Sequence, residues 1–257
     1  MLPAQRRARI IEILRRDRIV ALPDLAAQVG ASLSTTRRDV EYLCLTGHLT
    51  RTHGGAMINS SGERARETEP AISSQIERGA KDRIGQHAAA LIEPGQTVLF
   101  DSGSTTAACA RAAMKRGVPF TATTNDLMIA ATLAPATQIE CHMPAGRVRH
   151  GSDTLIGAAC LRDLGRLHAD IAFLGAHAVA IDGLSDTSIE LAEIKRGIVA
   201  AADTVILLVD SSKIFTRAFC RFAHVTEIDR IVTDDRISPQ ALGDLRATGV
   251  DVDIVPL

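Results

Sequence analysis

One face of an expected helix near the N-terminus carries Ser34, Arg37, Arg38 and Glu41. Their i, i+3, i+4, i+7 spacing places all four side chains on the same side of a helix. Hydroxyl and guanidinium groups on such a face can donate hydrogen bonds to phosphates and to base edges in the major groove of DNA. The chemistry of this face is therefore suited to a polyanion.

A second group, Asp101-Ser102-Gly103-Ser104-Thr105-Thr106, follows an apolar run and precedes a helical pattern. It offers backbone N–H groups, hydroxyl groups and a helix N-terminus, which suit a phosphate monoester. The loop lacks the Gly-Lys-Ser/Thr of a Walker loop and the Gly-x-Gly-x-x-Gly of a dinucleotide loop. From the pattern alone, a phosphate site and a turn that needs glycine only for its geometry are equally open.

Three helical patterns fill the region around the first group. The first spans roughly Pro3 to Asp17, the second has Pro23 near its start and Gly30 at its end, and the third begins after Ser32 and stops at Gly47. The following residues, 48–58, form two short extended pieces around a Gly-Gly pair. Three short helices, a tight connection between the second and the third, and a following hairpin predict a winged helix-turn-helix.

In this arrangement the N-terminal part of the third helix enters the major groove. We predict DNA contacts from Ser32, Ser34, Thr35, Thr36, Arg37 and Arg38, with Arg51 and His53 on the wing reaching the flanking backbone or minor groove. The alternative is that an Arg-rich helix is only a solvated face. The short turn before the helix and the wing after it favour DNA.

Charge is distributed unevenly along the chain. The 257 residues have a formal net charge of -1, but residues 1–57 contain nine Arg and no Lys against five acidic residues, a balance of +4. A basic module on an acidic body indicates a polyanion-binding head attached to another domain, although chance clustering gives the same pattern. The length allows one large or two modest domains.

Several classes of protein are disfavoured by composition. No run of about 18 apolar residues suggests a membrane span, and the N-terminus lacks the apolar core of a signal peptide, so we expect a cytoplasmic protein. The five Cys form no Cys-x-x-Cys pair, which is typical of a reducing compartment where each is a small buried hydrophobe. We expect no metal site and no cofactor.

The rest of the chain alternates between strand and helix patterns. We assign residues 1–58 to the DNA-binding domain, the polar stretch 59–73 to a linker and 74–257 to an α/β domain that binds an effector and mediates oligomerisation. Expected strands are Thr97 to Phe100, Phe120 to Thr124, Ile139 to His142, Ile171 to Leu174, Val205 to Val209, Ile231 to Thr233 and Val252 to Val255. With helices between most of them, this pattern predicts a largely parallel sheet covered on both faces.

The segment Ala31 to Ala56, ASLSTTRRDVEYLCLTGHLTRTHGGA, resembles the helix-turn-helix signature of the DeoR family of bacterial transcriptional regulators. Its most specific parts are the Arg37-Arg38-Asp39 triplet and the wing that starts at Arg51. Ala31 and Thr36 depart from the usual residues, which are mild changes of packing. The resemblance covers nearly the whole chain.

The resemblance implies a regulator whose C-terminal domain is similar in fold to ribose-5-phosphate isomerase. It implies a repressor of a sugar or polyol catabolic operon, released from operator DNA by a phosphorylated sugar-type effector. A homo-oligomer, either dimer or tetramer, is expected, with no membrane partner. The loop 101–106 would hold the effector phosphate, and the further effector positions are Asn125, Gly175, His177, Lys195 and Lys213. The alternative for the two lysines is surface solvation.

One position departs from the family in a way that bears on the ligand. Where the family usually reads Gly-Ala-Asp-Gly, this chain has Gly175-Ala176-His177-Ala178. An Asp there would accept hydrogen bonds from sugar hydroxyls, whereas a His can donate, accept or become cationic. Either the effector carries an extra acidic or otherwise different group, or the position has drifted without touching it. The roles of Arg147 and His150 are also undecided by the sequence. They either close over a ligand or are ordinary surface residues.

Two other functions are compatible with parts of the sequence. A phosphosugar isomerase with an attached DNA-binding domain needs a carboxylate poised to move a proton. His177 stands where related enzymes place an Asp, and Glu190 and Glu193 have no identifiable acidic partner, so no catalytic residue is predicted. The third hypothesis is a DNA-binding protein whose C-terminal domain serves only for oligomerisation.

Overall fold

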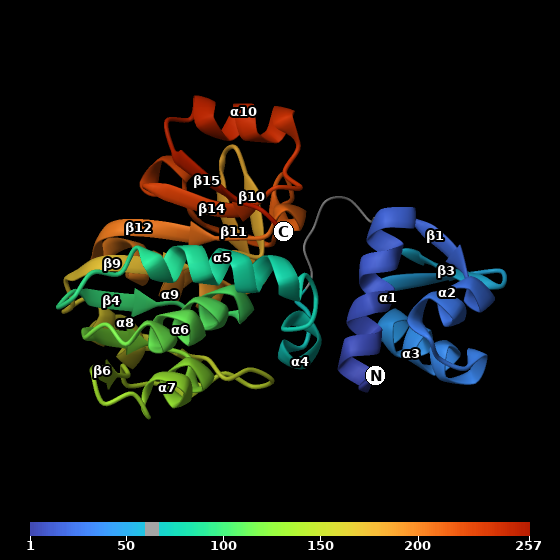
Figure 1. The fold of residues 1–257 in the computed structure, drawn as a ribbon, viewed down its shortest axis with the longest axis horizontal. Helices are drawn as coiled ribbons and strands as arrows, with labels where there is room; N and C mark the ends of the chain where they lie inside the picture. The colour runs from blue at the N-terminus through green and yellow to red at the C-terminus, as the bar shows by residue number, and fades with distance from the viewer. Residues whose placement is uncertain (60–66) are drawn as a thin grey trace. The chain divides into compact units, whose positions relative to one another are not determined.

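The computed structural model describes residues 1–59 and 67–257, which form two units, Met1–Arg78 and Gly79–Leu257 (Figure 1). Residues 60–66 of the predicted linker lie outside the described residues. The first unit is a small helical domain with a three-stranded sheet, and the second is an α/β domain. The expected fold class is confirmed.

The first unit has the predicted three helices and wing. Proline occupies the first turn of α1 and of α2, Gly30 ends α2 in the left-handed conformation at φ 65°, and the Ser32 side chain caps α3. A short strand that the sequence did not predict, β1, extends the wing to a sheet of order β1-β3-β2. The elements are α1 (Pro3–Asp17), β1 (Ile19–Ala21), α2 (Leu22–Val29), α3 (Leu33–Leu45), β2 (Leu49–Thr52), β3 (Gly55–Ile58) and α4 (Pro70–Ser73).

The core of this unit extends beyond the residues that the sequence assigned to it. Ile72 on α4 and Ile76 are buried with Ile10, Leu14 and other apolar side chains of the three helices. Our sequence boundaries placed these two isoleucines in the linker and at the start of the α/β domain. A single apolar residue in a polar stretch gives no periodic signal, so only the folded unit reveals its packing partner.

The second unit is built on a parallel sheet of seven strands in the order β15-β14-β12-β9-β4-β5-β6. All seven predicted strands belong to this sheet. They are β4 (Thr97–Phe100), β5 (Phe120–Thr124), β6 (Ile139–His142), β9 (Ala169–Leu174), β12 (Ala202–Leu208), β14 (Arg230–Asp234) and β15 (Asp251–Val255).

Helices cover both faces of the sheet (Figure 1). Because side chains alternate along a strand, Val98 and Phe100 of β4 pack on one face and Leu99 on the other. The first face carries α5 (Arg78–Ala90), α6 (Ser104–Arg116) and α7 (Leu127–Leu133), and the second carries α8 (Ala158–Leu164), α9 (Ile189–Ala200) and α10 (Pro239–Ala247).

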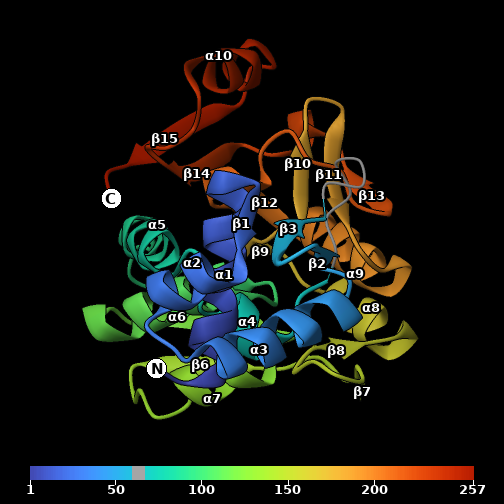
Figure 2. The ribbon, with the colours of Figure 1, turned by 90° about the vertical axis from the view of Figure 1, so that its right-hand side faces the viewer.

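Smaller β elements lie outside the main sheet. An antiparallel sheet of order β10-β11-β13 contains the hairpin of β10 (Ala178–Ala180) and β11 (Gly183–Asp186), visible side by side in Figure 2, with β13 (Cys220–Ala223). Ala178 is paired with Ser185 in this hairpin. A second hairpin joins β7 (Arg147–Val148) to β8 (Leu155–Ile156). One-turn helices η1 (Ser211–Lys213) and η2 (Val225–Glu227) complete the unit.

The direction in which strands are added reverses between β4 and β9. After β4 the chain adds β5 and β6 on one side, and then adds β9, β12, β14 and β15 on the other. In open parallel sheets, ligands bind beyond the carboxyl ends of the strands at such a switch point. Asp101 and Gly175 follow directly after these two strands, so the fold brings them to this position.

All five cysteines are free. Cys109 and Cys160 are buried as predicted, but Cys44, Cys141 and Cys220 are only partly buried. Burial raises the pKa of the Cys160 thiol to about 11, which keeps it protonated. Every helix in residues 1–59 and 67–257 is too short or too polar to span a bilayer.

Gly85 lets α5 approach α6 closely. A Cβ at this position would lie 2.6 Å from the backbone carbon of Ala108 and 2.6 Å from the backbone nitrogen of Cys109. We expect Gly85→Ala to separate the two helices and to lower the free energy of unfolding by about 1–3 kcal/mol. Thermal and urea denaturation of the full chain measure this effect.

Gly79, in the same helix, is the matched control, because a Cβ there would meet nothing within 4 Å. Gly79→Ala should leave the stability unchanged or raise it by at most about 1 kcal/mol. Equal effects of the two substitutions would show that close helix packing at Gly85 is not important for stability.

Candidate functional site

The N-terminal half of α3 presents a polar surface. Ser34, Arg37 and Arg38 are exposed, as the predicted DNA-contacting face requires. Thr36 is fully buried, and its hydroxyl donates to the backbone oxygen of Ser32 at 3.1 Å. The prediction that Thr36 contacts DNA is therefore wrong, because its position in the helix turns it toward the core.

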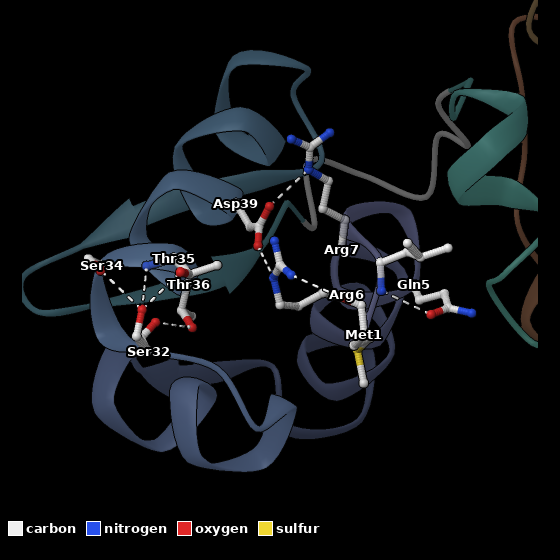
Figure 3. A network of polar contacts seen from close by, with 10 residues as sticks. Met1, Gln5, Arg6, Arg7, Ser32, Ser34, Thr35, Thr36 and Asp39 are labelled. Carbon is white, nitrogen blue, oxygen red and sulfur yellow. Dashed lines mark hydrogen bonds and ion pairs between the residues drawn. The ribbon is translucent and has the colours of Figure 1, made fainter.

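Ser32 organises the first turn of α3 (Figure 3). Its Oγ accepts the Thr35 backbone N–H at 3.2 Å and lies 2.8 Å from Thr35 Oγ1 and 3.0 Å from Ser34 Oγ. The cap fixes the start of the helix, and the hydroxyls gather where the free N–H groups of the first turn lie. This end of α3 is a cluster of hydrogen-bond donors.

A buried carboxylate joins α1 to α3. Asp39 accepts hydrogen bonds from Arg6 Nε and, at 3.0 Å, from Arg7 Nε (Figure 3). The guanidinium of Arg7 also lies 3.6 Å from the ring centroid of Tyr42 on α3. The sequence marks Asp39 only as part of the Arg37-Arg38-Asp39 triplet. Its contacts fix the position of α3 relative to α1.

Ion pairs neutralise much of the charge in this unit. Besides Asp39, the paired acids are Glu12 with Arg9 at 3.4 Å, Asp17 with Arg16 at 2.7 Å and Glu41 with Arg51 at 3.5 Å. Within residues 1–59 and 67–257, Arg37 and Arg38 have no acidic partner. Arg37 and Arg38 therefore expose positive charge on α3, while Arg51 on the wing is shared with Glu41 and His53 is exposed in the turn of the wing.

The loop after β4 forms the start of α6. Ser104 is the first residue of that helix, and Gly103 at φ 143° turns the chain into it. The backbone N–H groups of the first turn have no partner inside the helix. The Thr106 hydroxyl donates to the Gly103 oxygen at 2.8 Å.

The accessibility of the loop differs along its length. Gly103 is exposed, Ser102 and Ser104 are partly exposed, and Thr105 and Thr106 are buried. Only the hydroxyls of Ser102 and Ser104, together with the backbone N–H groups, are placed for direct contact with a ligand. The predicted contact from the Thr106 hydroxyl does not fit, because that group is buried and holds the loop together.

Polar residues after β5 support this loop. Asn125 is buried and donates from Nδ2 to the Leu155 oxygen at 3.3 Å, while its Oδ1 has no hydrogen-bond partner in the described part of the chain. Asp126 caps α7 through the N–H groups of Met128 and Ile129 and also accepts from the Gly103 N–H. The sequence pointed to Asn125 but missed Asp126, which fixes the loop from the neighbouring strand.

Lys195 on α9 is the centre of a buried ionic cluster. Its Nζ donates to Asp101 Oδ2 and, at 3.0 Å, to the Gly175 oxygen, and it lies 3.7 Å from Asp186 Oδ2. The Gly175 N–H also donates to Asp101 Oδ2 at 3.0 Å. These four residues come from four different segments, and Asp101 is distant in sequence from the other three. The alternative of a solvated surface lysine is wrong, because Lys195 is 4% exposed.

Burial and neighbouring charges oppose each other in this cluster; at Asp101 burial outweighs the charge of Lys195 and raises the pKa of the carboxyl. Burial acts to lower the pKa of Lys195, but the carboxylates of Asp101 and Asp186 outweigh it and hold the pKa above its ordinary value. For Asp186, burial acts to raise the pKa, but the nearby imidazole of His177 and the charge of Lys195 hold it well below its usual range. Lys195 is therefore a cation and Asp186 an anion across the physiological range.

His177 joins the cluster through Asp186. The Nδ1 atom of His177 lies 3.1 Å from Asp186 Oδ2, and the imidazole is 27% exposed. The hairpin explains this contact, because pairing of Ala178 with Ser185 places His177 opposite Asp186. Sequence reasoning missed Asp186, since only the register of two short strands brings it to His177.

The other predicted effector residue, Lys213, belongs to η1, which follows β12 at the same edge of the sheet. Asp210 caps η1 through the Ser212 N–H at 3.2 Å, and Asp234 accepts from the Ser211 N–H at 2.7 Å. Lys213 is half-buried. Its backbone position is thus fixed by carboxylates from the ends of two neighbouring strands.

The two loop residues left open by the sequence lie on or beside the β7–β8 hairpin. Arg147 forms an ion pair with Glu190 in the first turn of α9, and His150 is exposed.

Of the predicted effector residues, the structure brings together Asp101, Gly175, His177 and Lys195, and it adds Asp186 to them. In the described part of the chain, no group of three or more His, Cys, Asp and Glu side chains could hold a metal ion.

Comparison with protein families identifies both units. Residues 6–62 match the DeoR-like helix-turn-helix domain, and residues 76–235 match the DeoR C-terminal sensor domain. Similar curated proteins include the HTH-type transcriptional regulator GlpR of Haloferax volcanii, 31% identical over 98% of this chain and 98% of the relative. The glycerol-3-phosphate regulon repressor of Escherichia coli is 28% identical over 91% and 92% of the two chains.

Solved structures give a weaker likeness. Ribose-5-phosphate isomerase A from Methanocaldococcus jannaschii aligns with a TM-score of 0.39 and 19% identity over 53% of this chain and 54% of that one. The eIF2B delta subunit from Chaetomium thermophilum aligns with a TM-score of 0.44 and 21% identity over 63% and 61%.

Removing the Lys195 ammonium should leave two buried carboxylates without a neighbouring lysine. We expect Lys195→Met to lower the free energy of unfolding by about 3–5 kcal/mol in urea denaturation. The double variant Lys195→Met with Asp101→Asn should recover part of this loss, because one buried charge is removed with its partner.

The control is Lys115→Met on the exposed end of α6, which should change the stability by no more than about 0.5 kcal/mol. Asp101→Asn alone completes the cycle, and if the losses of Lys195→Met and Asp101→Asn simply add in the double variant, the two side chains are not energetically coupled.

Proposed function

The chain belongs to the DeoR family of transcriptional regulators, and from this premise we propose that it represses an operon for the breakdown of a sugar or polyol. In this proposal α3 binds operator DNA, and a phosphorylated sugar-type effector binds at the carboxyl edge of the large sheet and releases the DNA. The relatives named above are described as a regulator and a repressor.

The observation that carries the DNA-binding part is the distribution of charge in the first unit. Arg37 and Arg38 are exposed and lack acidic partners among the described residues, whereas Arg6 and Arg7 are held by the buried Asp39. Free guanidinium groups at the N-terminal half of a recognition helix suit phosphates and guanine edges in the major groove. The hydroxyls of Ser32, Ser34 and Thr35 support the same surface.

We infer a homo-oligomer, because operator recognition by helix-turn-helix domains commonly uses two recognition helices on two half-sites. The effector then acts through linkage. A ligand that binds the DNA-incompetent arrangement more tightly shifts the protein toward it. A coupling of about 1–3 kcal/mol changes the affinity for the operator roughly 5- to 150-fold.

The effector site is supported by the loop Asp101 to Thr106 and the cluster beside it. The free N–H groups at the start of α6 and the hydroxyls of Ser102 and Ser104 suit a phosphate. The buried oxygens Asp101 Oδ1 and Asn125 Oδ1 have no hydrogen-bond partner in the described part of the chain, and sugar hydroxyls would supply the donors. Lys213 is placed at the same edge, where it would add positive charge.

Replacing Arg37 or Arg38 by Ala should weaken binding of operator DNA by about 1–3 kcal/mol, roughly 5- to 150-fold, because each removes a charged contact. A lost phosphate contact should also reduce the salt dependence of binding by about one unit of slope. Fluorescence anisotropy of labelled DNA from upstream of the protein's own gene measures both.

Arg9→Ala is the matched control, since it removes the same charge from an exposed position on α1 that is paired with Glu12. It should change the affinity much less. If all three variants bind like the native protein, α3 is not the recognition helix.

Ser104→Ala should make the protein unresponsive to a phosphorylated sugar while it still binds operator DNA, because one hydroxyl donor at the phosphate site is lost. Ser104 is a cleaner test than Asp101, since Asp101 also neutralises the buried Lys195. The readout is release of labelled operator DNA by a panel of sugar phosphates.

Thr248→Ala, at the end of α10 and before the amino end of β15, is the control and should respond normally. Normal release from the Ser104 variant would remove this loop from the effector site.

A further inference from the structure

We propose that His177 recognises a carboxylate, so that the effector is a phosphorylated sugar acid with a phosphate at one end and a carboxylate at the other. This inference rests on the proposed function, because it takes the phosphate site at residues 101–106 as given. It adds the chemical class of the other end of the ligand and the residue that selects it.

The geometry leaves one nitrogen of His177 for a ligand. Nδ1 lies 3.1 Å from Asp186 Oδ2, and Asp186 is itself fixed by the Thr187 N–H at 2.7 Å. Within the described residues, Nε2 has no partner, and the ring is the partly exposed member of a cluster whose other side chains are buried. The imidazole therefore presents Nε2 outward from a rigid base.

The position of the ring decides which nitrogen can meet an anion. The Nδ1 atom of His177 faces the Asp186 carboxylate, so Nε2 is the nitrogen on the ligand side. A ring with an N–H at each nitrogen donates from Nδ1 toward Asp186 and from Nε2 toward an anion. A charge-assisted hydrogen bond from that N–H to a carboxylate is stronger than one to a neutral hydroxyl.

The two ends of the site are close enough for one small molecule. A Cβ built on Gly175 would lie 3.6 Å from the Ser102 oxygen, so Gly175 adjoins the phosphate loop. His177 is two residues further along the chain, a reach of at most about 7 Å. A ligand held by its phosphate at the loop therefore needs only a short carbon chain to place a carboxylate beside His177.

The oxygens between these two ends fit the middle of such a molecule. Asp101 Oδ1 is buried without a hydrogen-bond partner in residues 1–59 and 67–257. The hydroxyls of a sugar acid would donate to it. The ammonium of Lys195 binds the other oxygen of Asp101 and so reduces repulsion between Asp101 and the ligand carboxylate. A ligand with an uncharged end would leave the Nε2–H without an anionic acceptor.

The test uses matched pairs of ligands that differ only in whether the end opposite the phosphate is a carboxylate or an alcohol. The pairs are 3-phosphoglycerate with glycerol 3-phosphate, 4-phosphoerythronate with erythritol 4-phosphate, and 6-phosphogluconate with glucitol 6-phosphate. Isothermal titration of the full chain gives Kd for each. We expect the acid to bind roughly 10- to 100-fold more tightly than the alcohol in at least one pair.

His177→Asn should abolish this preference because the acid loses its charge-assisted hydrogen bond and binds more weakly. The Kd of the alcohol should stay within about threefold of the native value, since the alcohol makes no such bond. His177→Gln is the second variant if the first does not fold. His168→Asn, at an exposed histidine, is the control and should keep the preference.

Three outcomes would overturn the proposal in distinguishable ways. If the alcohol binds as tightly as the acid in every pair, the effector is not a sugar acid. If the acid preference survives in a folded His177 variant, another residue reads the carboxylate. If none of the six compounds binds the native chain, the phosphate-effector part of the proposed function fails, and this inference fails with it.

Discussion

The ammonium of Lys195 is the constraint on which the architecture of the α/β unit depends. Burying a cation costs several kcal/mol unless charged and polar partners surround it. Those partners are Asp101 after β4, Gly175 after β9 and Asp186 at the end of β11. Two parallel strands, a hairpin and helix α9 must therefore meet at one place, and that place is the switch point where an open parallel sheet binds its ligand.

In the first unit a buried carboxylate, Asp39, likewise joins separate elements, and the desolvation penalty is smaller because its partners are only partly buried. Asp39 is buried, whereas Arg6 and Arg7 keep part of their surface in water. This arrangement orients α3. It also engages Arg6 and Arg7 in ion pairs, which makes them less available to bind a polyanion. The guanidinium groups of Arg37 and Arg38, which lack such partners among the described residues, then define the polar face of the helix. Charges that hold the domain together and charges that remain exposed are thus separated within one short segment.

How far each site could be predicted differs for physical reasons. The loop 101–106 and the face of α3 are continuous in sequence, so both stand out as patterns, although the pattern alone left the loop open between a phosphate site and a turn. The Lys195–Asp101 contact could not be derived from spacing, because it joins residues separated by more than ninety positions. The hydroxyl of Thr36 suits DNA, but its helical phase turns it into the core, so residue chemistry alone predicts the wrong role. Ile72 was missed because one apolar residue in a short polar stretch has no period.

The sequence by itself determined the two-domain plan, the three helices and wing, and all seven strands of the large sheet, because runs of apolar residues with period 2 or 3.6 encode local structure directly. Family motifs carried the regulator assignment. Only the tertiary structure decided the order of the strands, the pairing of His177 with Asp186 and the burial of Lys195. These features depend on the register of short strands and on contacts across the sheet edge, and local sequence patterns carry no information about either.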